Sequence, residues 1–391
     1  MEIIVHRGTH QIGGVATEIR TQFSRIIIDL GSELTESCGT ARPLNIDGVT
    51  NANGTCDAVF FTHYHGDHIG QLYQLQNGVD TYMGKLAKKV AIIVAKRMQS
   101  PFLSKLQVAK TFAPEESICI KDIKVTPILV DHSAIDSYMF LIEAEGKRVL
   151  HTGDFRTHGF RGKGLPKYLY AYVGKVDVVI TEGTTLSRID SAIITEKQIQ
   201  QEVKKYLISY KYVYMLCSST NLDRICALSK ATPYGKYFFC DGYQRKLIEA
   251  VEGKWQKYSK LYNKLKVTEY ADNLYSKAKD YGFLMVVRDN KEFRSIMKKF
   301  DASQSIILYS MWNGYRTRKG SGIPSFLKLA DNWTYLHTSG HCTRSALNMV
   351  LSITKPDVVI PVHTDVPEMV KEVVTNTRVK VLKDGEVYKV I

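Results

Sequence analysis

Hydrophobic and polar positions change their pattern along the chain, and the first region has the texture of short strands. From residue 1 to about 189, short apolar runs are separated by Gly, Asn and Asp, which is typical of β-strands joined by tight turns. Such runs occupy residues 26–28, 58–61, 125–130, 138–142 and 178–180. Helical periodicity lies between some of them, most clearly over residues 85–97. This region therefore predicts an α/β fold in which a sheet and helices form layers.

The texture changes over residues 190–325, where longer helical patterns rich in Lys and Tyr dominate. After about residue 326 the strand pattern returns, as in residues 333–336 and 358–362. We therefore predict an inserted α/β domain. The first part of the parent domain would span residues 1–189, the insertion 190–325, and the C-terminal part of the parent domain 326–391.

The composition is that of an ordinary globular protein that does not need disulfide bonds to fold. Hydrophobic residues make up 44% and charged residues 24% of its 391 residues. No apolar run reaches the length of a membrane span, and the chain opens on a strand pattern, so we expect no membrane association and no export. The seven cysteines form no CxxC pair, which fits free thiols in a reducing cytoplasm.

Positive charge is the first hint of a partner, although it has two readings. The net charge of +14 favours polyanions, but charge alone also serves solubility. Residues 190–325 contain 24 Lys and Arg against 13 Asp and Glu, a difference of +11, together with 14 of the 23 tyrosines. Such a mixture suits a surface that binds phosphates and stacks bases, and it also suits a core with a solvated face.

The strongest chemical signal is a cluster of histidines that follows the apolar run 58–61. His63 and His65 are two residues apart, so a chain leaving a strand can aim both rings at one ion. Asp67 and His68 follow the bend at Gly66 and can face a second ion. Three of only 11 histidines lie within six positions, which chance placement explains poorly. The cluster predicts a metal site.

Three further candidates, Asp29, His132 and Asp154, each follow an apolar run. A carboxylate can bridge two cations and a neutral imidazole cannot, so Asp154 is the natural bridge. Asp29 has two readings, as a direct ligand or as a residue that orients a histidine, and we favour the second.

These motifs, in this order, resemble the metallo-β-lactamase superfamily. Its first four motifs match Asp29, residues 63–68, His132 and Asp154. The remainder resembles the β-CASP branch, which carries an inserted domain and then an acidic residue followed by two histidines. Those positions are matched here by Glu182, His341 and His363. The closest likeness is to bacterial ribonuclease J, and it implies an αββα sandwich with an inserted α/β β-CASP domain.

The resemblance also implies a ligand set and a mechanism. One zinc ion would take His63, His65 and His132, and the other Asp67, His68 and His363, with Asp154 and a hydroxide between them; manganese is an alternative metal. The hydroxide would attack an RNA phosphodiester and leave 5′-phosphate and 3′-hydroxyl ends. His341 would protonate the leaving oxygen while Glu182 keeps it charged. The expected catalytic residues are Asp29, Asp67, Glu182 and His341.

Several assignments keep a second reading. Glu182 can equally be a strand-end carboxylate bonded to backbone amides. By likeness to ribonuclease J, Ser339 and Gly340 would hold a terminal 5′-phosphate, but a plain tight turn explains them equally well. His337 would contact a phosphate or be a structural histidine.

The substrate class also has alternatives. RNA-directed members carry His at the last motif where DNA-repair relatives tend to have Val, so His363 favours RNA. The basic, tyrosine-rich insertion is expected to leave a groove that duplex RNA enters poorly, which favours single-stranded RNA. The alternatives are a DNA nuclease, a hydrolase of small esters, lactams or thioesters, and an RNA-binding protein that retains metals. The sequence leaves endonuclease or exonuclease action, target RNA and oligomeric state open, with a homo-oligomer as one option.

Overall fold

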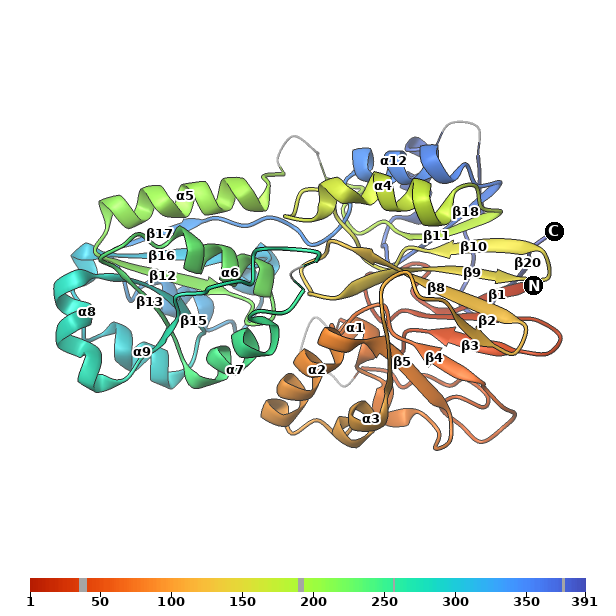
Figure 1. The fold of residues 1–391 in the computed structure, drawn as a ribbon, viewed down its shortest axis with the longest axis horizontal. Helices are drawn as coiled ribbons and strands as arrows, with labels where there is room; N and C mark the ends of the chain where they lie inside the picture. The colour runs from red at the N-terminus through yellow and green to blue at the C-terminus, as the bar shows by residue number, and fades with distance from the viewer. Residues whose placement is uncertain (35–40, 189–192, 256, 375–376) are drawn as a thin grey trace. The chain divides into compact units, whose positions relative to one another are not determined.

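The structure is a computed structural model that describes residues 1–34, 41–188, 193–255, 257–374 and 377–391, and it divides into two compact units (Figure 1). Unit 1 comprises Met1–Thr157, Arg161–Ala192 and Gly340–Ile391. Unit 2 comprises His158–Phe160 and Ile193–Ser339. Along the chain, unit 2 is thus inserted into unit 1.

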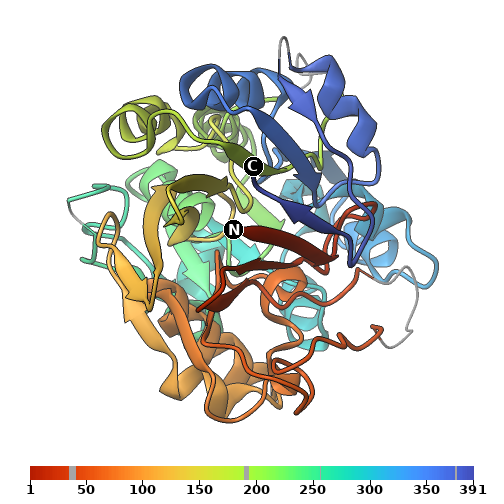
Figure 2. The same ribbon diagram turned by 90° about the vertical axis from the view of Figure 1, so that its right-hand side faces the viewer.

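Two seven-stranded sheets form the centre of unit 1. The first has the order β20-β1-β2-β3-β4-β5-β6, with β20 (Val387–Lys389), β1 (Glu2–Arg7), β2 (Ala16–Arg20), β3 (Arg25–Ile28), β4 (Ala58–Phe60), β5 (Asp80–Gly84) and β6 (Lys110–Phe112). The second has the order β19-β18-β11-β10-β9-β8-β7, with β19 (Arg378–Val379), β18 (Val358–Val362), β11 (Val178–Glu182), β10 (Lys147–His151), β9 (Ser137–Ala144), β8 (Ile123–Val130) and β7 (Ile118–Ile120). Because β20 pairs with β1, the two ends of the chain lie side by side (Figure 2).

Aromatic side chains join the inner faces of the two sheets. Phe60 of the first sheet meets Phe140 of the second edge to face, with ring centroids 5.8 Å apart. Phe112 of the first sheet makes a similar contact with Phe140 at 5.7 Å. All three rings are buried, so the sheets pack face to face around an apolar layer.

Helices cover the outer faces of this sandwich (Figure 1). Beside the first sheet lie α2 (Lys85–Met98) and α3 (Leu103–Val108). The helices α4 (Leu165–Tyr168) and α12 (Arg344–Thr354) share an apolar cluster with strands of the second sheet. The predicted αββα sandwich is therefore confirmed. The shorter helical turns of unit 1 are α1 (Gly66–Ile69), η1 (Leu72–Gln74), η2 (Gly162–Gly164), η3 (Leu169–Val173) and η7 (Pro367–Glu372).

Unit 2 is built on one six-stranded parallel sheet of order β14-β13-β15-β12-β16-β17. Its strands are β12 (Tyr212–Cys217), β13 (Tyr237–Cys240), β14 (Thr268–Glu269), β15 (Phe283–Val287), β16 (Ser305–Ser310) and β17 (Asn332–Tyr335). One face packs against α5 (Glu196–Ser209), α6 (Leu222–Ala231) and α7 (Gly242–Val251). The other face packs against α8 (Tyr275–Tyr281), α9 (Lys291–Met297) and α11 (Ile323–Leu327). The remaining turns are η5 (Asp272–Leu274), η6 (Ala302–Gln304) and α10 (Asn313–Thr317). Unit 2 is therefore a doubly wound α/β sheet.

Local sequence explains where the helices of unit 2 begin. Thr195 and Gln198 form a reciprocal capping box at the start of α5. Asn221, Asp241 and Asn290 each accept a backbone N–H in the first turn of α6, α7 and α9. Asn221, Asp241 and Asn290 follow the carboxyl ends of β12, β13 and β15, so these three helices begin soon after a strand ends.

One predicted boundary differs from the structure. We expected the parent domain to resume at residue 326, but unit 2 extends to Ser339. The reason is β17, which pairs with β16 from Ile306↔Asn332 to Tyr309↔Tyr335. A strand's local pattern does not specify which sheet it joins. The other boundary, expected between residues 189 and 190, lies outside the described residues.

In the part of the chain that the structure describes, no helix is long and apolar enough to cross a membrane.

A buried ion pair fixes the loops that follow β8 and β10. Nε of the fully buried Arg156 donates to Oδ1 of Asp131 at 2.7 Å. The other carboxylate oxygen accepts the backbone N–H groups of Arg161 and Gly162 at 2.6 and 3.0 Å. One carboxylate thus links three points of unit 1.

We expect Asp131→Ala to lower the free energy of unfolding by about 3–5 kcal/mol, because it removes the carboxylate that pairs with the buried Arg156 guanidinium. Urea denaturation followed by circular dichroism measures the loss. The control is Asp80→Ala, which removes an exposed ion pair with Lys110 and should change little. Equal losses in the two variants would contradict this role for the buried pair.

Candidate active site

The residues predicted to bind metal all lie in unit 1, at the carboxyl ends of strands. In the first sheet, β3 and β4 run parallel, so Asp29 and the loop 62–68 emerge at the same edge. In the second sheet, β10, β11 and β18 run parallel, and β8 shares their direction because β9 is antiparallel to both β8 and β10. The residues at or after these ends are His132, Asp154, Glu182 and His363. The topology thus brings distant segments to one edge of the sandwich.

Three histidines converge on one point. The ring nitrogens of His63, His65 and His132 form one group of possible ligands. Nδ1 of His65 lies 3.1 Å from Nε2 of His63 and 3.2 Å from Nε2 of His132. Nitrogens bound tetrahedrally to zinc at 2.0–2.1 Å lie about 3.3 Å from one another, so this spacing fits a single ion.

Hydrogen bonds on the far side of two rings fix their tautomers. The Thr62 hydroxyl donates to Oδ2 of Asp29 at 2.7 Å, so at 3.1 Å it accepts the proton on Nδ1 of His63. Nδ1 of His132 donates to the carbonyl of Gly340 at 2.6 Å. Nε2 of both rings therefore carries a lone pair, as a metal ligand must.

A second group contains Asp67, His68 and His363. Nε2 of His363 lies 3.2 Å from Oδ2 of Asp67. Nδ1 of His68 donates to Oδ2 of Asp29 at 2.8 Å. Nδ1 of His363 donates at 2.8 Å to the Thr184 hydroxyl, which itself donates to the His363 carbonyl at 3.1 Å. Because Nδ1 donates in both rings, Nε2 is the atom of each ring that would bind a cation.

Asp154 lies between the two groups. Its Oδ2 is 3.2 Å from Nε2 of His68, 3.8 Å from Nε2 of both His63 and His132, and 3.9 Å from Nε2 of His363. Among the described residues, neither Asp154 oxygen has a hydrogen-bond partner, and neither does Nε2 of His68, although all three atoms are buried. Buried polar atoms without partners are costly. Divalent cations between these atoms would remove that cost, so the residues fit a two-metal site.

The pKa values of the first group favour the metal-binding form. Burial and then the neighbouring imidazoles lower the pKa of His63 well below its usual value. Burial lowers the pKa of His65 to about 4 and that of His132 well below the usual value. These rings are therefore neutral near pH 7, which is the state that binds a cation.

The bridging carboxylate and its neighbour have pKa shifts of opposite sign. Burial opposes the charge on Asp154, but His363, His68 and His341 outweigh it and lower the pKa of Asp154. Burial also lowers the pKa of His68, but Asp154 and Asp29 outweigh it and raise that pKa well above the usual value. The carboxylates of Asp154 and Asp29 thus favour a positively charged His68. A bound metal cation could supply the compensating positive charge in place of the proton on His68.

Beside these groups, His341 and Glu182 form a pair. Nδ1 of His341 donates to Oε2 of Glu182 at 2.9 Å, while Oε1 of Glu182 accepts the backbone N–H groups of Phe155 and Cys342 at 2.9 and 3.1 Å. Glu182 therefore both pairs with His341 and accepts backbone N–H groups, so the two interpretations of this residue are compatible. Burial lowers the pKa of His341, but Glu182 and Asp154 outweigh it and raise the pKa to about 9.

Unusual backbone geometry aims several of these residues. Asp29 and His363 have φ angles of 62° and 51°, a left-handed conformation that costs a non-glycine residue about 1–3 kcal/mol. Gly153 has φ 52°, and a Cβ there would lie 2.9 Å from both Thr62 Cγ2 and the Tyr138 carbonyl oxygen. Only glycine fits directly before Asp154. Left-handed backbone thus occurs at the site directly after β3 and β18 and shortly after β10.

Asp29 is placed as an orienting residue, in line with the favoured reading. Its Oδ1 accepts the Thr62 backbone N–H at 2.8 Å, and its Oδ2 contacts Thr62 and His68. The carboxylate is fully buried beneath the rings. It thereby holds ligands and is not itself in a ligand group among the described residues.

The three predicted substrate-binding residues lie along one segment. The carbonyl of Ser339 accepts a hydrogen bond from Nε2 of His158 at 2.8 Å, and the carbonyl of Gly340 holds His132. A Cβ at Gly340 would lie 2.5 Å from Oγ of Ser133, so this position needs glycine. Nδ1 of His337 accepts from Nη1 of Arg224 at 3.2 Å. These contacts fix the segment but do not test phosphate binding.

Sequence reasoning missed Arg224, which is 1% exposed in unit 2. Its guanidinium makes two hydrogen bonds to Glu196, at 3.0 and 2.6 Å. It also donates to the carbonyls of Ser310 and Thr338 at 3.1 and 3.2 Å. Arg224 thus fixes the chain that leads into the His341 motif. Arg224 follows Asp223 in α6, so in the sequence alone it resembles a solvated helix position.

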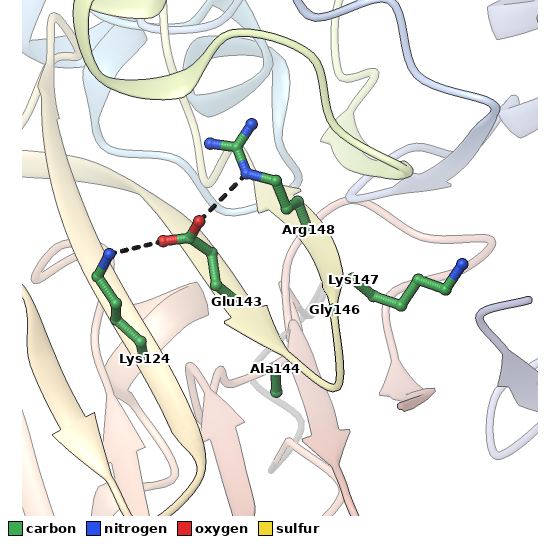
Figure 3. Close-up of a pocket in the computed structure, with 6 residues that line it drawn as sticks. All are labelled: Lys124, Glu143, Ala144, Gly146, Lys147 and Arg148. Atoms are coloured by element: carbon green, nitrogen blue, oxygen red, sulfur yellow. Dashed lines mark hydrogen bonds and ion pairs between the residues drawn. The ribbon is translucent and has the colours of Figure 1, made fainter.

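A pocket of about 460 Å³ lies on β8, β9 and β10, at the ends of these strands that are remote from the candidate active site (Figure 3). It is lined by the first residues of β8 and β10 and the last of β9, whereas the candidate metal ligands His132 and Asp154 follow the other ends of β8 and β10. Its one carboxylate, Glu143, is paired with Lys124 and Arg148 at 3.0 and 3.2 Å. The pocket carries no group comparable with the histidine site.

Comparison with known proteins agrees with this architecture. Residues 24–198 match the family described as "Beta-lactamase superfamily domain". A crystal structure of a protein of unknown function from Enterococcus faecalis V583 has the same fold, with a TM-score of 0.78 and 18% identity over 99% of both chains.

The curated relatives include two kinds of ribonuclease. Ribonuclease J of Mycoplasma genitalium is 22% identical over 85% of this chain and 63% of its own length. Ribonuclease J of Mycoplasma pneumoniae is 22% identical over 93% of this chain and 67% of its own length. Ribonuclease Z of Lachnoclostridium phytofermentans is 26% identical over 57% of this chain and 70% of its own length. The chain thus spans less than two thirds of the first of these relatives. Its residues 24–198 thus match a β-lactamase superfamily domain, and the chain is similar in sequence to ribonucleases J and Z.

Proposed function

We propose that this protein is a metal-dependent nuclease that hydrolyses phosphodiester bonds of single-stranded RNA and leaves 5′-phosphate and 3′-hydroxyl ends. The observation that carries the proposal is Asp154, a buried carboxylate with the ring nitrogens of two histidine groups around it and Nδ1 of His341 3.5 Å away. Its similarity to ribonucleases J and Z supports RNA as the substrate. The basic, tyrosine-rich segment 190–325 supports a polyanion.

The proposed metals are two zinc ions, with manganese as a substitute. Three imidazoles without a thiolate suit zinc, and the mixed oxygen and nitrogen set of Asp67, His68 and His363 accepts either metal. Bound together, two divalent cations would acidify a shared water and neutralise charge that builds on the phosphate. The chain's own part is to orient the ligands through Asp29, Thr62 and Thr184.

His341 would act as the general acid. The departing 3′-oxygen needs a proton because an alkoxide is a poor leaving group. Nδ1 of His341 is bonded to Glu182, so the transferred proton would come from Nε2. A raised pKa keeps that proton in place at neutral pH. His337, Ser339 and Gly340 stay candidates for contact with a substrate phosphate.

A reducing compartment suits this protein, and we propose the cytoplasm. The described cysteines are free thiols. Burial raises the pKa values of Cys217 and Cys240 to about 12, so these thiols are unreactive. Cell fractionation with an antibody against the chain tests the location.

The direct test is digestion of end-labelled single-stranded RNA beside a DNA strand of the same sequence and a small ester. RNA cleavage that greatly exceeds the other two supports the proposal. A ladder of internal products indicates an endonuclease, and mononucleotides released from one labelled end indicate an exonuclease. Preference for DNA or for the ester would overturn the RNA assignment.

We expect Asp154→Ala to lose at least one of two bound metal ions and nearly all activity, because its carboxylate lies against ligands of both groups. Metal content per chain measures the loss. Glu143→Ala is the control, since that carboxylate contacts only Lys124 and Arg148 in the described structure. Full metal content and full activity in Asp154→Ala would refute the bridging role.

His341→Ala should lower kcat by about 10²–10⁴-fold with both metals retained, because only the proton donor is removed. His341 also lies within ligand distance of Asp154 and His363, so metal analysis must accompany the kinetics. A substrate with a 3′-bridging sulfur needs no proton on its leaving group. The variant should recover most of its deficit on that substrate, and an unchanged deficit would exclude general-acid catalysis.

Glu182→Gln should shift the alkaline limb of kcat/KM to lower pH. The active form of His341 is protonated, so the rate falls as pH rises through its pKa, and loss of the neighbouring negative charge lowers that pKa. The Gln oxygen can still accept the N–H groups of Phe155 and Cys342, which preserves the backbone. A pH–rate profile of both proteins measures the shift. An unmoved limb would show that Glu182 does not set the proton affinity of His341.

A further inference from the structure

Four aromatic side chains gather on the surface of unit 2 near the end of β16 and along β17. Trp312, Tyr315, Trp333 and Tyr335 are 53%, 47%, 43% and 47% exposed. Together with Arg316 they form what we call the aromatic strip. Grouped aromatic surface of this kind marks an interaction site more often than chance exposure does.

The local structure holds these rings in place. The Tyr309 hydroxyl donates to the Trp312 carbonyl at 2.8 Å, and the Trp312 and Tyr315 rings meet edge to face at 5.4 Å. Trp333 and Tyr335 are two residues apart in β17, so they project on the same face of the strand. That strand is an edge of the sheet. The strip is therefore ordered before any ligand arrives.

Positive charge accompanies the strip. Arg316 lies over the Trp333 ring at 5.4 Å, and its Nε donates to Oδ1 of Asn313 at 2.9 Å, which holds the guanidinium flat. Arg318 and Lys319 follow on the exposed surface. The sequence from residue 302 to residue 330 contains no Asp or Glu. Flat aromatic faces beside these cations suit a ligand with both π-faces and phosphates, and Asp331 is the one acidic residue in the sequence between 302 and 340.

We infer that the aromatic strip binds unpaired RNA bases by stacking, with Arg316, Arg318 and Lys319 contacting the adjoining phosphates. Stacking tolerates any base and requires that the base be unpaired, so the strip would select single strands without reading sequence. The inference deepens the proposed function and rests on it, since RNA is the proposed substrate.

The position of the strip in the sheet supports a substrate role. Trp312 and Tyr335 lie at the carboxyl ends of parallel strands, the edge where doubly wound sheets bind ligands. The Tyr335 ring is 6.0 Å from that of His337, a candidate phosphate contact. Along the chain, Tyr335 precedes His341 by six residues. The strip thus leads along β17 into the segment that carries the proposed acid.

A second copy of the chain is a less suitable occupant. Two copies that met through this surface would bring the same cations together, with no acidic residue between 302 and 330 to offset them. An RNA strand supplies the opposite charge. Self-association is therefore an outcome for the experiment to detect.

The experiment compares a short oligouridylate with an abasic oligonucleotide of the same length and charge. Binding is measured by fluorescence anisotropy on full-length His341→Ala protein, so that cleavage is slow. Trp312→Leu and Trp333→Leu should each weaken oligouridylate binding about 5- to 100-fold, the range for loss of one stacked base, and leave binding of the abasic strand nearly unchanged. Tyr234→Leu, at a side chain that is 99% exposed elsewhere in unit 2, is the matched control and should change neither.

Tryptophan emission gives a second readout. The chain has three tryptophans, of which Trp312 and Trp333 belong to the strip and Trp255 does not. Oligouridylate should quench the emission of protein that keeps only the strip tryptophans, and it should leave protein that keeps only Trp255 unchanged. Melting temperatures of all variants confirm that the fold is intact.

Three results would overturn the inference. They are binding equal to the parent protein in both tryptophan variants, equal weakening of the abasic and base-containing strands, or a change in sedimentation without a change in RNA binding. The last result would identify the strip as an interface between copies. Failure of the proposed function looks different, because the parent protein would then neither bind nor cleave RNA at all.

Discussion

The interaction on which the site depends is the contact of one buried carboxylate, Asp154, with imidazoles from both ligand groups. Its Oδ2 lies within 3.9 Å of ring nitrogens of His63, His68, His132 and His363. A carboxylate removed from water this completely is stable only with compensating positive charge. The strands that end around it belong to both sheets, so the sandwich must form before that charge can be gathered. Formation of the fold and assembly of the candidate metal site are therefore coupled in unit 1.

Threonine hydroxyls orient several of the histidine rings around Asp154. A hydroxyl both donates and accepts, so Thr62 can donate to Asp29 while it accepts from His63, and Thr184 can donate to a backbone carbonyl while it accepts from His363. A carboxylate in the place of either threonine would add negative charge beside the ligands. The hydroxyls fix the tautomers without altering the charge of the site.

The sequence was informative where chemistry is local, and it was silent where partners are distant. The cluster from His63 to His68 and the residues at strand ends predicted the ligands, and the family likeness supplied their order. Thr62, Thr184 and Arg224 were missed because a hydroxyl or a lone arginine has a meaning only through its partner, and the partner of Thr184 lies 179 residues away. The place of β17 in unit 2 was missed for the same reason, since the residues of β17 alone do not show that this strand pairs with β16.

The proposed acid depends on both units through one short segment of chain. Arg224 of unit 2 holds Thr338, whereas Gly340 and His341 are bonded to His132 and Glu182 within unit 1. Glu182 sets the proton affinity of His341, and Arg224 limits the freedom of the chain that delivers it. Loss of Arg224 would leave the charge of Glu182 intact, so it would disturb the position of the acid more than its pKa. The charge beside His341 and the restraint on its chain segment thus come from different residues, Glu182 of unit 1 and Arg224 of unit 2.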